Sequence, residues 1–195
     1  MNDIGIFLDR DGTINHEVDF LDSPEELKLI DGSAEAIREA NKMGWKVFIV
    51  TNQSGIARGL FSEQQLKKIH DALIEKLKSE GAFIDAIYYC PHHPEFGDAI
   101  YQIDCDCRKP KIGMLKTAAN EFKISLPDSF MIGDKMIDIQ TGINAGMTTI
   151  LVLTGYGQEE LKICKEQKIH INYVAKNLLE AVQIIKKHIL LKTKL

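Results

Sequence analysis

Two kinds of segment alternate along the whole chain, and this alternation limits the folds open to it. Short apolar runs with strand character lie at 6–8, 45–50, 84–89, 129–132 and 148–152. Helical spacing is found at 34–43, 63–79, 113–122, 136–145, 159–166 and 176–188, with a further short strand expected at 173–174. Because the strand runs are continuously apolar, we expect both faces of the sheet to be covered. The pattern predicts an α/β, Rossmann-like fold: a mostly parallel sheet with helices on both faces.

The size and charge of the chain narrow its class. Its 195 residues suffice for one domain with a full core, and we expect a single domain over 1–195. The net charge is only −4 and no basic stripe is present, so we expect no nucleic-acid partner. Residues 1–8 lack Lys and Arg, and no apolar run approaches the roughly 20 residues of a membrane span. We therefore expect a cytoplasmic monomer without a membrane partner.

The first apolar run ends in two carboxylates, Asp9 and Asp11, with one residue between them. Side chains alternate along an extended segment, so both carboxylates leave it on the same side. Their mutual repulsion would be relieved by a bound cation, or by keeping one carboxyl protonated. The alternative is a turn with two solvated aspartates, because Asp and Gly are ordinary turn residues.

Two later strands also end in polar residues, namely Thr51-Asn52 and Gly133-Asp134. The carboxyl ends of parallel strands meet at one edge of the sheet, where ligands bind. This convergence favours a site over a solvated turn. A phosphate ester is the substrate class that fits these residues, because Mg²⁺ held by Asp9, Asp134 and a backbone carbonyl near Asp11 would cancel its charge.

Such a site would have a defined division of roles. One carboxylate of the pair could attack phosphorus, and the other could serve as general acid and base. A lysine and a hydroxyl would hold the remaining phosphoryl oxygens, and Lys109 and Thr51 are the candidates.

An irregular insertion at about 90–110 carries Cys90, His92, His93, Cys105 and Cys107. Three cysteines and one histidine can close a tetrahedral structural zinc site, and zinc would stabilise a loop with few apolar residues. His92 is the better fourth ligand because both ligand pairs then have i, i+2 spacing, and His93 is the alternative. A disulfide is disfavoured in the cytoplasm.

The second cysteine pair continues directly into Arg108 and Lys109. Zinc would therefore fix the loop that delivers Lys109 to the phosphoryl group. Arg108 could form paired hydrogen bonds to a second anionic group.

Taken in order, Asp9-Arg-Asp11-Gly-Thr13, Thr51-Asn52, Lys109 and Gly133-Asp134 resemble the motifs of the haloacid dehalogenase (HAD) superfamily of Mg²⁺-dependent phosphohydrolases. The resemblance implies a three-layer HAD fold without a large cap domain. It implies that Asp9 is the nucleophile that forms an aspartyl-phosphate, and that Asp11 is the general acid/base. Thr51 and Lys109 would stabilise the phosphoryl group, while Asp9, the Asp11 carbonyl and Asp134 would bind magnesium.

Two branches of this superfamily share the zinc loop: the histidinol-phosphate phosphatases and the D-glycero-D-manno-heptose-1,7-bisphosphate 7-phosphatases. The stretches 50–59, 88–94 and 105–110 look more like the heptose enzymes, above all Gln53-Ser-Gly-Ile-Ala-Arg58-Gly. The resemblance implies removal of the 7-phosphate, in the synthesis of nucleotide-heptose precursors of lipopolysaccharide or S-layer. The extra charge of a bisphosphate could be met by Arg58 and Arg108, whereas cationic histidinol would prefer acids.

Histidinol-phosphate hydrolysis in histidine biosynthesis remains the alternative reaction. A catalytically inactive sugar-phosphate-binding module is the alternative from another class, although no catalytic position is missing. Together with the charge argument for the two arginines, the resemblance to the heptose enzymes implies substrate contacts at Glu17, Val18, Asp19, Phe20, Thr51, Asn52, Gln53, Ser54, Arg58, Arg108, Lys109 and Lys135.

Overall fold

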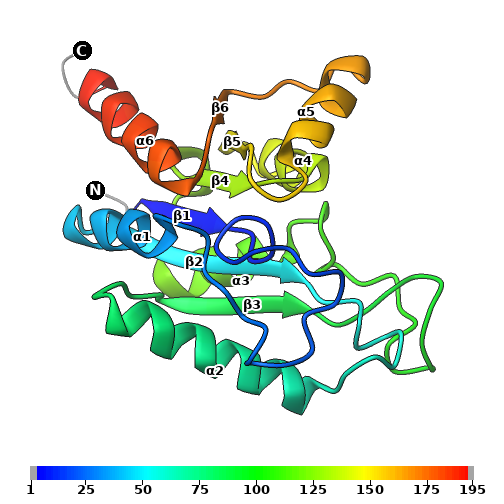
Figure 1. Cartoon of the computed structure of the whole chain (residues 1–195). Helices are drawn as coiled ribbons and strands as arrows, with labels where there is room; N and C mark the ends of the chain where they lie inside the picture. The colour runs from blue at the N-terminus through cyan, green and yellow to red at the C-terminus, as the bar shows by residue number, and fades with distance from the viewer. Residues whose placement is uncertain (1–3, 193–195) are drawn as a thin grey trace.

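A computed structural model describes residues 4–192, and these residues form a six-stranded sheet with helices on both faces (Figure 1). The strands are β1 (Gly5–Leu8), β2 (Lys46–Asn52), β3 (Ala86–Cys90), β4 (Phe130–Gly133), β5 (Thr148–Val152) and β6 (Tyr173–Ala175). Their order is β3-β2-β1-β4-β5-β6 and every pairing is parallel. The predicted fold class is confirmed.

The helices that cover the sheet are α1 (Ser33–Lys42), α2 (Glu63–Ser79), α3 (Gly113–Phe122), α4 (Met136–Asn144), α5 (Gly157–Glu166) and α6 (Leu178–Lys192), with a short 3₁₀ turn at Leu126–Asp128. None of the helices within residues 4–192 combines the length and hydropathy of a bilayer span.

Alternate residues of the central strands enter two separate cores, as a doubly covered sheet requires. Ile6 and Leu8 of β1 pack in one core with α1, α2 and α6, whereas Phe7 points to the other core with α3. The same alternation occurs in β2, where Val47 and Ile49 lie in the first core and Phe48 and Val50 in the second.

The strand order places the three polar strand ends side by side. β1 lies between β2 and β4, so the residues that follow each of these strands meet at one edge of the sheet. The long connections 9–32, 53–62 and 91–112 gather beyond the arrowheads of β1, β2 and β3 (Figure 1). These loops take the place of a cap domain.

Most helix and strand boundaries agree with those predicted from the sequence, and the differences have local causes. The helices at 63–79 and 113–122 begin and end where the spacing predicts. The last helix begins at Leu178 rather than at 176, because the Asn177 side chain accepts a hydrogen bond from the Glu180 amide at 3.0 Å and so caps the helix. Strand β3 begins at Ala86 rather than at 84, because Asp85 turns its carboxylate onto the Val47 amide at 2.8 Å.

The cap of α2 allows a direct test of local stability. Ser62 accepts a hydrogen bond from the Gln65 amide at 3.1 Å, which satisfies one of the free donors of the first turn. We expect Ser62→Ala to lower the free energy of unfolding by about 1 kcal/mol, whereas Ser62→Asp, which keeps an acceptor, should cost much less. Denaturant titration of both variants checks this, and equal losses would contradict the assigned cap.

Candidate active site

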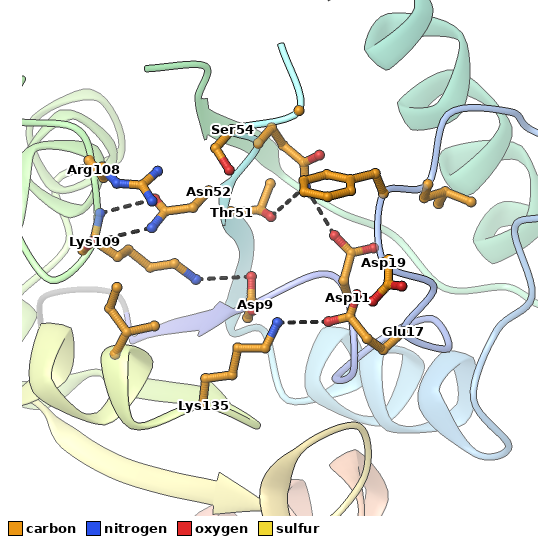
Figure 2. A pocket seen from close by; sticks show the side chains of 15 residues that line it. Asp9, Asp11, Glu17, Asp19, Thr51, Asn52, Ser54, Arg108, Lys109 and Lys135 are labelled. Carbon is orange, nitrogen blue, oxygen red and sulfur yellow. Dashed lines mark hydrogen bonds and ion pairs between the residues drawn. The ribbon is translucent and has the colours of Figure 1, made fainter. Parts of the chain in front are cut away.

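A cavity of about 310 Å³ opens at the carboxyl ends of β1 and β2 (Figure 2). Its lining contains most of the residues that the sequence predicts: Asp9, Asp11, Glu17, Asp19, Phe20, Thr51, Asn52, Gln53, Ser54, Arg108, Lys109 and Lys135. Three further residues line it, namely Leu21, Gly55 and Ile137. The convergence expected from the parallel strands is therefore real.

Two expected substrate contacts, Val18 and Arg58, lie outside this lining. Val18 lies in the loop between Glu17 and Asp19, which both line the cavity, and it is itself 36% exposed. The Arg58 guanidinium lies 3.9 Å from the ring centroid of Phe96 in the zinc loop. Arg58 is thus engaged in a cation–π contact at the surface.

Asp9 and Asp134 come together because β1 and β4 are neighbours in register. Leu8 pairs with Ile132, so the two aspartates follow adjacent strand ends. The Asp9 amide donates to the Ile132 carbonyl at 2.9 Å, which extends the ladder to the first aspartate. The site is therefore built on the sheet rather than on a loop.

Lys109 reaches this edge from the far side of the insertion. Its Nζ lies 2.9 Å from Asp9 Oδ1 and 2.6 Å from Asp138 Oδ1, and its side chain is only 2% exposed (Figure 2). Burial works against the charge of Lys109, but the carboxylates of Asp138 and Asp9 outweigh it and raise its pKa. The ammonium is thus held charged against the predicted nucleophile.

The backbone of Lys109 is fixed from β2. Asn52 Oδ1 accepts from the Lys109 amide at 3.0 Å, and Asn52 Nδ2 donates to the Lys109 carbonyl at 3.2 Å. One amide side chain therefore holds both backbone groups of a residue 57 positions away. In this structure Asn52 positions Lys109 in addition to lining the cavity.

Asp138 is the functional residue that the sequence reasoning missed. It is fully buried in the first turn of α4, where Oδ1 accepts from Lys109 and Oδ2 accepts from the Lys135 amide at 3.1 Å. The available signal was an acidic residue four positions after Asp134, between the apolar Ile137 and Ile139. A carboxylate on the apolar side of a helix requires a partner.

Asp11 is surrounded by hydrogen-bond donors. Arg10 donates from Nη2 to Oδ2 at 2.8 Å, Asn15 donates to Oδ1 at 2.9 Å, and Gln53 donates to Oδ2 at 3.0 Å. Burial alone would raise the pKa of Asp11, but the charge of Arg10 and these hydrogen bonds bring it below its usual value. Gln53 also donates to Thr51 Oγ1 at 2.9 Å, so it links the two sides of the site.

Asp134 has the environment of a metal ligand. Its Oδ2 accepts from the Tyr156 amide at 2.9 Å, but its buried Oδ1 has no hydrogen-bond partner among the described residues. Burial and the nearby charges of Asp9 and Asp138 raise the pKa of Asp134 to about 8. An unpartnered, buried carboxylate oxygen costs free energy unless a cation binds it.

The donor set at this point suits magnesium. Carboxylate oxygens of Asp9, Asp134 and Asp138 all lie within 4.8 Å of one another. Both oxygens of Asp138 accept hydrogen bonds, from Lys109 and from a backbone amide. Asp9 contacts Lys109 through Oδ1, and Asp134 contacts the Tyr156 amide through Oδ2, so the second oxygen of each is the candidate metal ligand. Hard oxygen ligands of this kind suit Mg²⁺, as they suit other hard cations such as Ca²⁺ and Mn²⁺.

Two glycines make room for Asp134. A Cβ atom on Gly12 or on Gly155 would lie 2.2 Å from Asp134 Oδ2, and both residues have positive φ, +79° and +53°. The hydroxyl of Thr154 donates to the Gly12 carbonyl at 2.6 Å and joins the two loops. The carboxylate is therefore enclosed by main chain on two sides.

The second metal cluster is formed by Cys90, His92, Cys105 and Cys107, whose ligand atoms lie within 4.8 Å of one another. The sulfur of Cys105 is 3.4 Å from that of Cys90 and 3.1 Å from that of Cys107, and His92 Nδ1 is 3.5 Å from Cys107 Sγ. Zinc–sulfur bonds of about 2.3 Å would place tetrahedral corners about 3.8 Å apart. The cluster is thus close to the size of a structural zinc site.

The geometry favours His92 over His93 in the cluster. His93 Nδ1 accepts from the Glu95 amide at 3.1 Å and its ring packs 4.7 Å from Phe96, outside the cluster. The ring of His92 lies with the three cysteines and could complete a Cys₃His set. The backbone carbonyl of His92 also accepts from Arg108 Nη1 at 3.0 Å, so the cluster fixes the arginine that enters the cavity.

Lys135 closes the opposite side of the cavity. Its Nζ lies 2.7 Å from Glu17 Oε2, which ties the loop after β1 to the start of α4 (Figure 2). Although burial opposes its charge, Glu17 and the acidic cluster raise the pKa of Lys135. Three cations, Arg108, Lys109 and Lys135, therefore face one small polar cavity.

Loss of zinc should loosen the insertion while leaving the sheet intact. We expect Cys105→Ser to increase proteolysis within 91–108 and to lower phosphomonoester turnover at least about tenfold, because Arg108 and Lys109 lose their support. Far-UV circular dichroism should stay unchanged. Cys164→Ala, at a buried cysteine outside the cluster, is the matched control. Unchanged proteolysis and turnover in the Ser variant would contradict this role.

The raised pKa of Asp134 predicts a pH dependence for magnesium-free protein. The pKa is about 8 in the fold against an ordinary value of 3.8, so unfolding releases a proton between these values. The stabilising contribution is present below about pH 4 and is lost as the pH rises to about 8. Asp134→Asn should flatten this slope and abolish stabilisation by added Mg²⁺.

Melting temperatures at several pH values, with and without Mg²⁺, test this expectation. Asp19→Asn, at another carboxylate of the cavity, should keep the slope of the natural protein. A variant at position 134 that keeps both the slope and the response to Mg²⁺ would refute the assigned metal site.

Comparisons with known proteins agree with this geometry. The HAD-hydrolase-like family model matches residues 106–181, which include Lys109, Asp134 and Asp138. The D-glycero-beta-D-manno-heptose-1,7-bisphosphate 7-phosphatase of Haemophilus influenzae is 48% identical over 151 residues, or 77% of this chain and 82% of that protein. The protein of the same name from Escherichia coli K12 is 40% identical over 183 residues, or 93% of each chain.

Among solved structures, the D,D-heptose 1,7-bisphosphate phosphatase from B. bronchiseptica, complexed with magnesium and phosphate, superposes with a TM-score of 0.83. It is 34% identical, and the match covers 95% of this chain and 99% of that one. Similarity at this level extends over nearly the whole of the relatives. The chain therefore belongs to the D-glycero-D-manno-heptose-1,7-bisphosphate 7-phosphatase family of HAD-type, magnesium-dependent phosphatases.

Proposed function

We propose that the protein removes the 7-phosphate of D-glycero-D-manno-heptose 1,7-bisphosphate through an aspartyl-phosphate on Asp9. The observation that carries this proposal is the position of the Asp9 carboxylate, 2.9 Å from the Lys109 ammonium and beside the unpartnered oxygen of Asp134. A carboxylate nucleophile needs positive charge around it before it can meet a phosphate dianion. The choice of substrate rests on the names of the relatives, which are heptose-1,7-bisphosphate 7-phosphatases.

In this proposal Asp9 attacks phosphorus, and the bond from phosphorus to the sugar oxygen breaks as the acyl phosphate forms. Mg²⁺, held by Asp9, Asp134 and the backbone carbonyl of Asp11, would cancel charge on the phosphoryl oxygens. The Lys109 ammonium and the Thr51 hydroxyl hold the remaining oxygens as the charge moves. Asp138 keeps Lys109 aligned with Asp9.

Asp11 supplies the proton to the departing sugar oxygen and later takes a proton from the water that hydrolyses the intermediate. Its lowered pKa means that it rests as a carboxylate. The incoming phosphate dianion adds like charge nearby, which raises the pKa of the carboxyl and favours the protonated form. The same groups then serve both half-reactions.

The cations that face the cavity support a bisphosphate substrate. Lys109 is engaged at Asp9. Arg108, whose Nη1 donates to the His92 carbonyl, would use its other N–H groups to bind the second phosphate through paired hydrogen bonds. Lys135, paired with Glu17, lies beside the metal site and can contact the reacting phosphate. Ser54, Gln53, Asp19 and Phe20 complete the sugar-binding surface in this proposal.

We also propose the β-anomer as the preferred substrate, since several relatives carry that anomer in their names. The proposed setting is the cytoplasm, and the proposed state is a monomer. No disulfide joins the four cysteines, which all lie within residues 4–192, and this is consistent with a reducing compartment.

A phosphate-release assay with four substrates tests the proposal: both anomers of the heptose bisphosphate, the heptose 7-monophosphate and histidinol phosphate. We expect the β-bisphosphate to have the highest kcat/KM. Asp9→Asn should lower turnover by more than about a thousandfold, because the nucleophile is lost. A phosphoryl group on the peptide that contains Asp9 should appear after rapid quenching of the natural enzyme.

Preference for histidinol phosphate would reject the proposed substrate while leaving the mechanism standing. Substantial activity in the Asp9→Asn variant would reject the covalent mechanism whatever the substrate.

A further inference from the structure

Arg10 is a fully buried arginine placed between the two catalytic aspartates. A buried guanidinium needs a partner for each of its N–H groups. Its Nε and Nη2 are directed at the Asp11 carboxylate, at 3.1 Å from Oδ1 and 2.8 Å from Oδ2. The remaining nitrogen, Nη1, lies 3.2 Å from Nε2 of His70 on helix α2.

The roles in this last contact follow from the chemistry of the two groups. A guanidinium can only donate, so Nε2 of His70 must accept and the ring proton must be on Nδ1. Burial and the charge of Arg10 lower the pKa of His70 to about 3, so the ring is neutral, as an acceptor must be. The low pKa of His70 and its role as acceptor from Arg10 therefore agree.

The position of the His70 ring is itself fixed. His70 is 7% exposed and lies on the buried face of α2, next to Ile69 and one turn from Leu66 and Leu73. The Tyr89 ring packs against it edge-on, with centroids 5.9 Å apart, and the Tyr89 hydroxyl donates to Glu63 at 2.6 Å. The acceptor atom is thus held by a helix that contributes no residue to the cavity lining.

We infer that His70 is a positioning residue for the reaction: by accepting from Arg10 Nη1, it sets the plane of the guanidinium and thereby the direction of the Asp11 carboxylate. A paired arginine–carboxylate contact is planar, so rotation of one group turns the other. Without the acceptor, the guanidinium would reorient to satisfy Nη1 elsewhere and Asp11 would turn with it. This inference rests on the proposed role of Asp11 as general acid.

The loss of rate that follows from a misplaced Asp11 should depend on the leaving group. A sugar alkoxide leaves poorly and needs the Asp11 proton, whereas p-nitrophenolate leaves readily without one. Misplacement of Asp11 should therefore slow the first turnover of a sugar phosphate and spare that of p-nitrophenyl phosphate. General loss of stability would slow both.

The experiment compares first-turnover rates for the two esters in His70 variants of the full-length, metal-loaded enzyme. We expect His70→Leu to lower cleavage of the heptose bisphosphate about tenfold with little change in KM, and to leave p-nitrophenolate release within about twofold. His70→Gln, whose amide oxygen can reach the place of Nε2, should recover most of the lost rate. His70→Asn is one methylene shorter than Gln and should not recover the rate. If the Leu variant does not fold, the comparison of the Gln and Asn variants tests the same inference.

Two further variants calibrate the result. Asp11→Asn gives the full loss of general-acid catalysis, so it should change the ratio of the two rates more than any His70 variant. Leu77→Ala, at a buried residue on the same helix and two turns from His70, should destabilise the protein and leave the ratio unchanged.

The inference fails if His70→Leu slows both esters equally, or if Gln and Asn at position 70 behave alike. A normal ratio in Asp11→Asn would overturn the proposed acid role, and the inference with it. A changed ratio in Asp11→Asn together with a normal ratio in the His70 variants would overturn the inference alone. If the heptose ester is not a substrate, another sugar phosphate that the enzyme cleaves serves in its place.

Discussion

Three buried carboxylates around one ammonium are the constraint on which the rest of the structure depends. Asp9, Asp134 and Asp138 lie within 4.8 Å of one another, and Lys109 contacts two of them. Such a cluster is unfavourable in a folded protein unless its charge is compensated. The fold must therefore deliver a lysine to this point and leave a place for a cation. Both requirements are those of an enzyme that transfers a phosphoryl group to a carboxylate.

The surrounding elements can be understood as support for this cluster. The β1–β4 pairing brings two of the aspartates together, and the first turn of α4 adds the third. Lys109 has two independent supports, because Asn52 binds its backbone from β2 and the cysteine–histidine cluster fixes the chain just before it. Rigid elements, together with a structural metal in the cysteine–histidine cluster, would supply the precision that positioned catalytic groups require.

The sequence predicted those parts of the site that follow from strand order and from local ligand spacing. Continuous apolar runs imply a parallel sheet, and a parallel sheet implies that Asp9, Thr51 and Asp134 meet. The Cys₃His set could be predicted from the i, i+2 spacing of its two pairs, Cys90 with His92 and Cys105 with Cys107. These inferences need no knowledge of how the layers pack.

The rest depends on tertiary packing, which spacing does not encode. Asp138 becomes a site residue only because α4 begins beside Lys109, and His70 becomes an acceptor only because α2 lies over Arg10. Arg58, an expected phosphate contact, packs its guanidinium against the ring of Phe96 in the zinc loop. In each case the partner side chain comes from a distant element. The apolar neighbours of Asp138 indicate that its carboxylate needs a partner, but they do not say which residue supplies it.

The enclosure of Asp134 by Gly12 and Gly155 has a consequence for the choice of ion. With main chain on both sides, the carboxylate cannot retreat from the metal position. Calcium bonds to oxygen at about 2.3–2.6 Å and magnesium at about 2.0–2.1 Å, so the larger ion would need a ligand that yields. Discrimination against calcium would then originate in two residues that have no side chain.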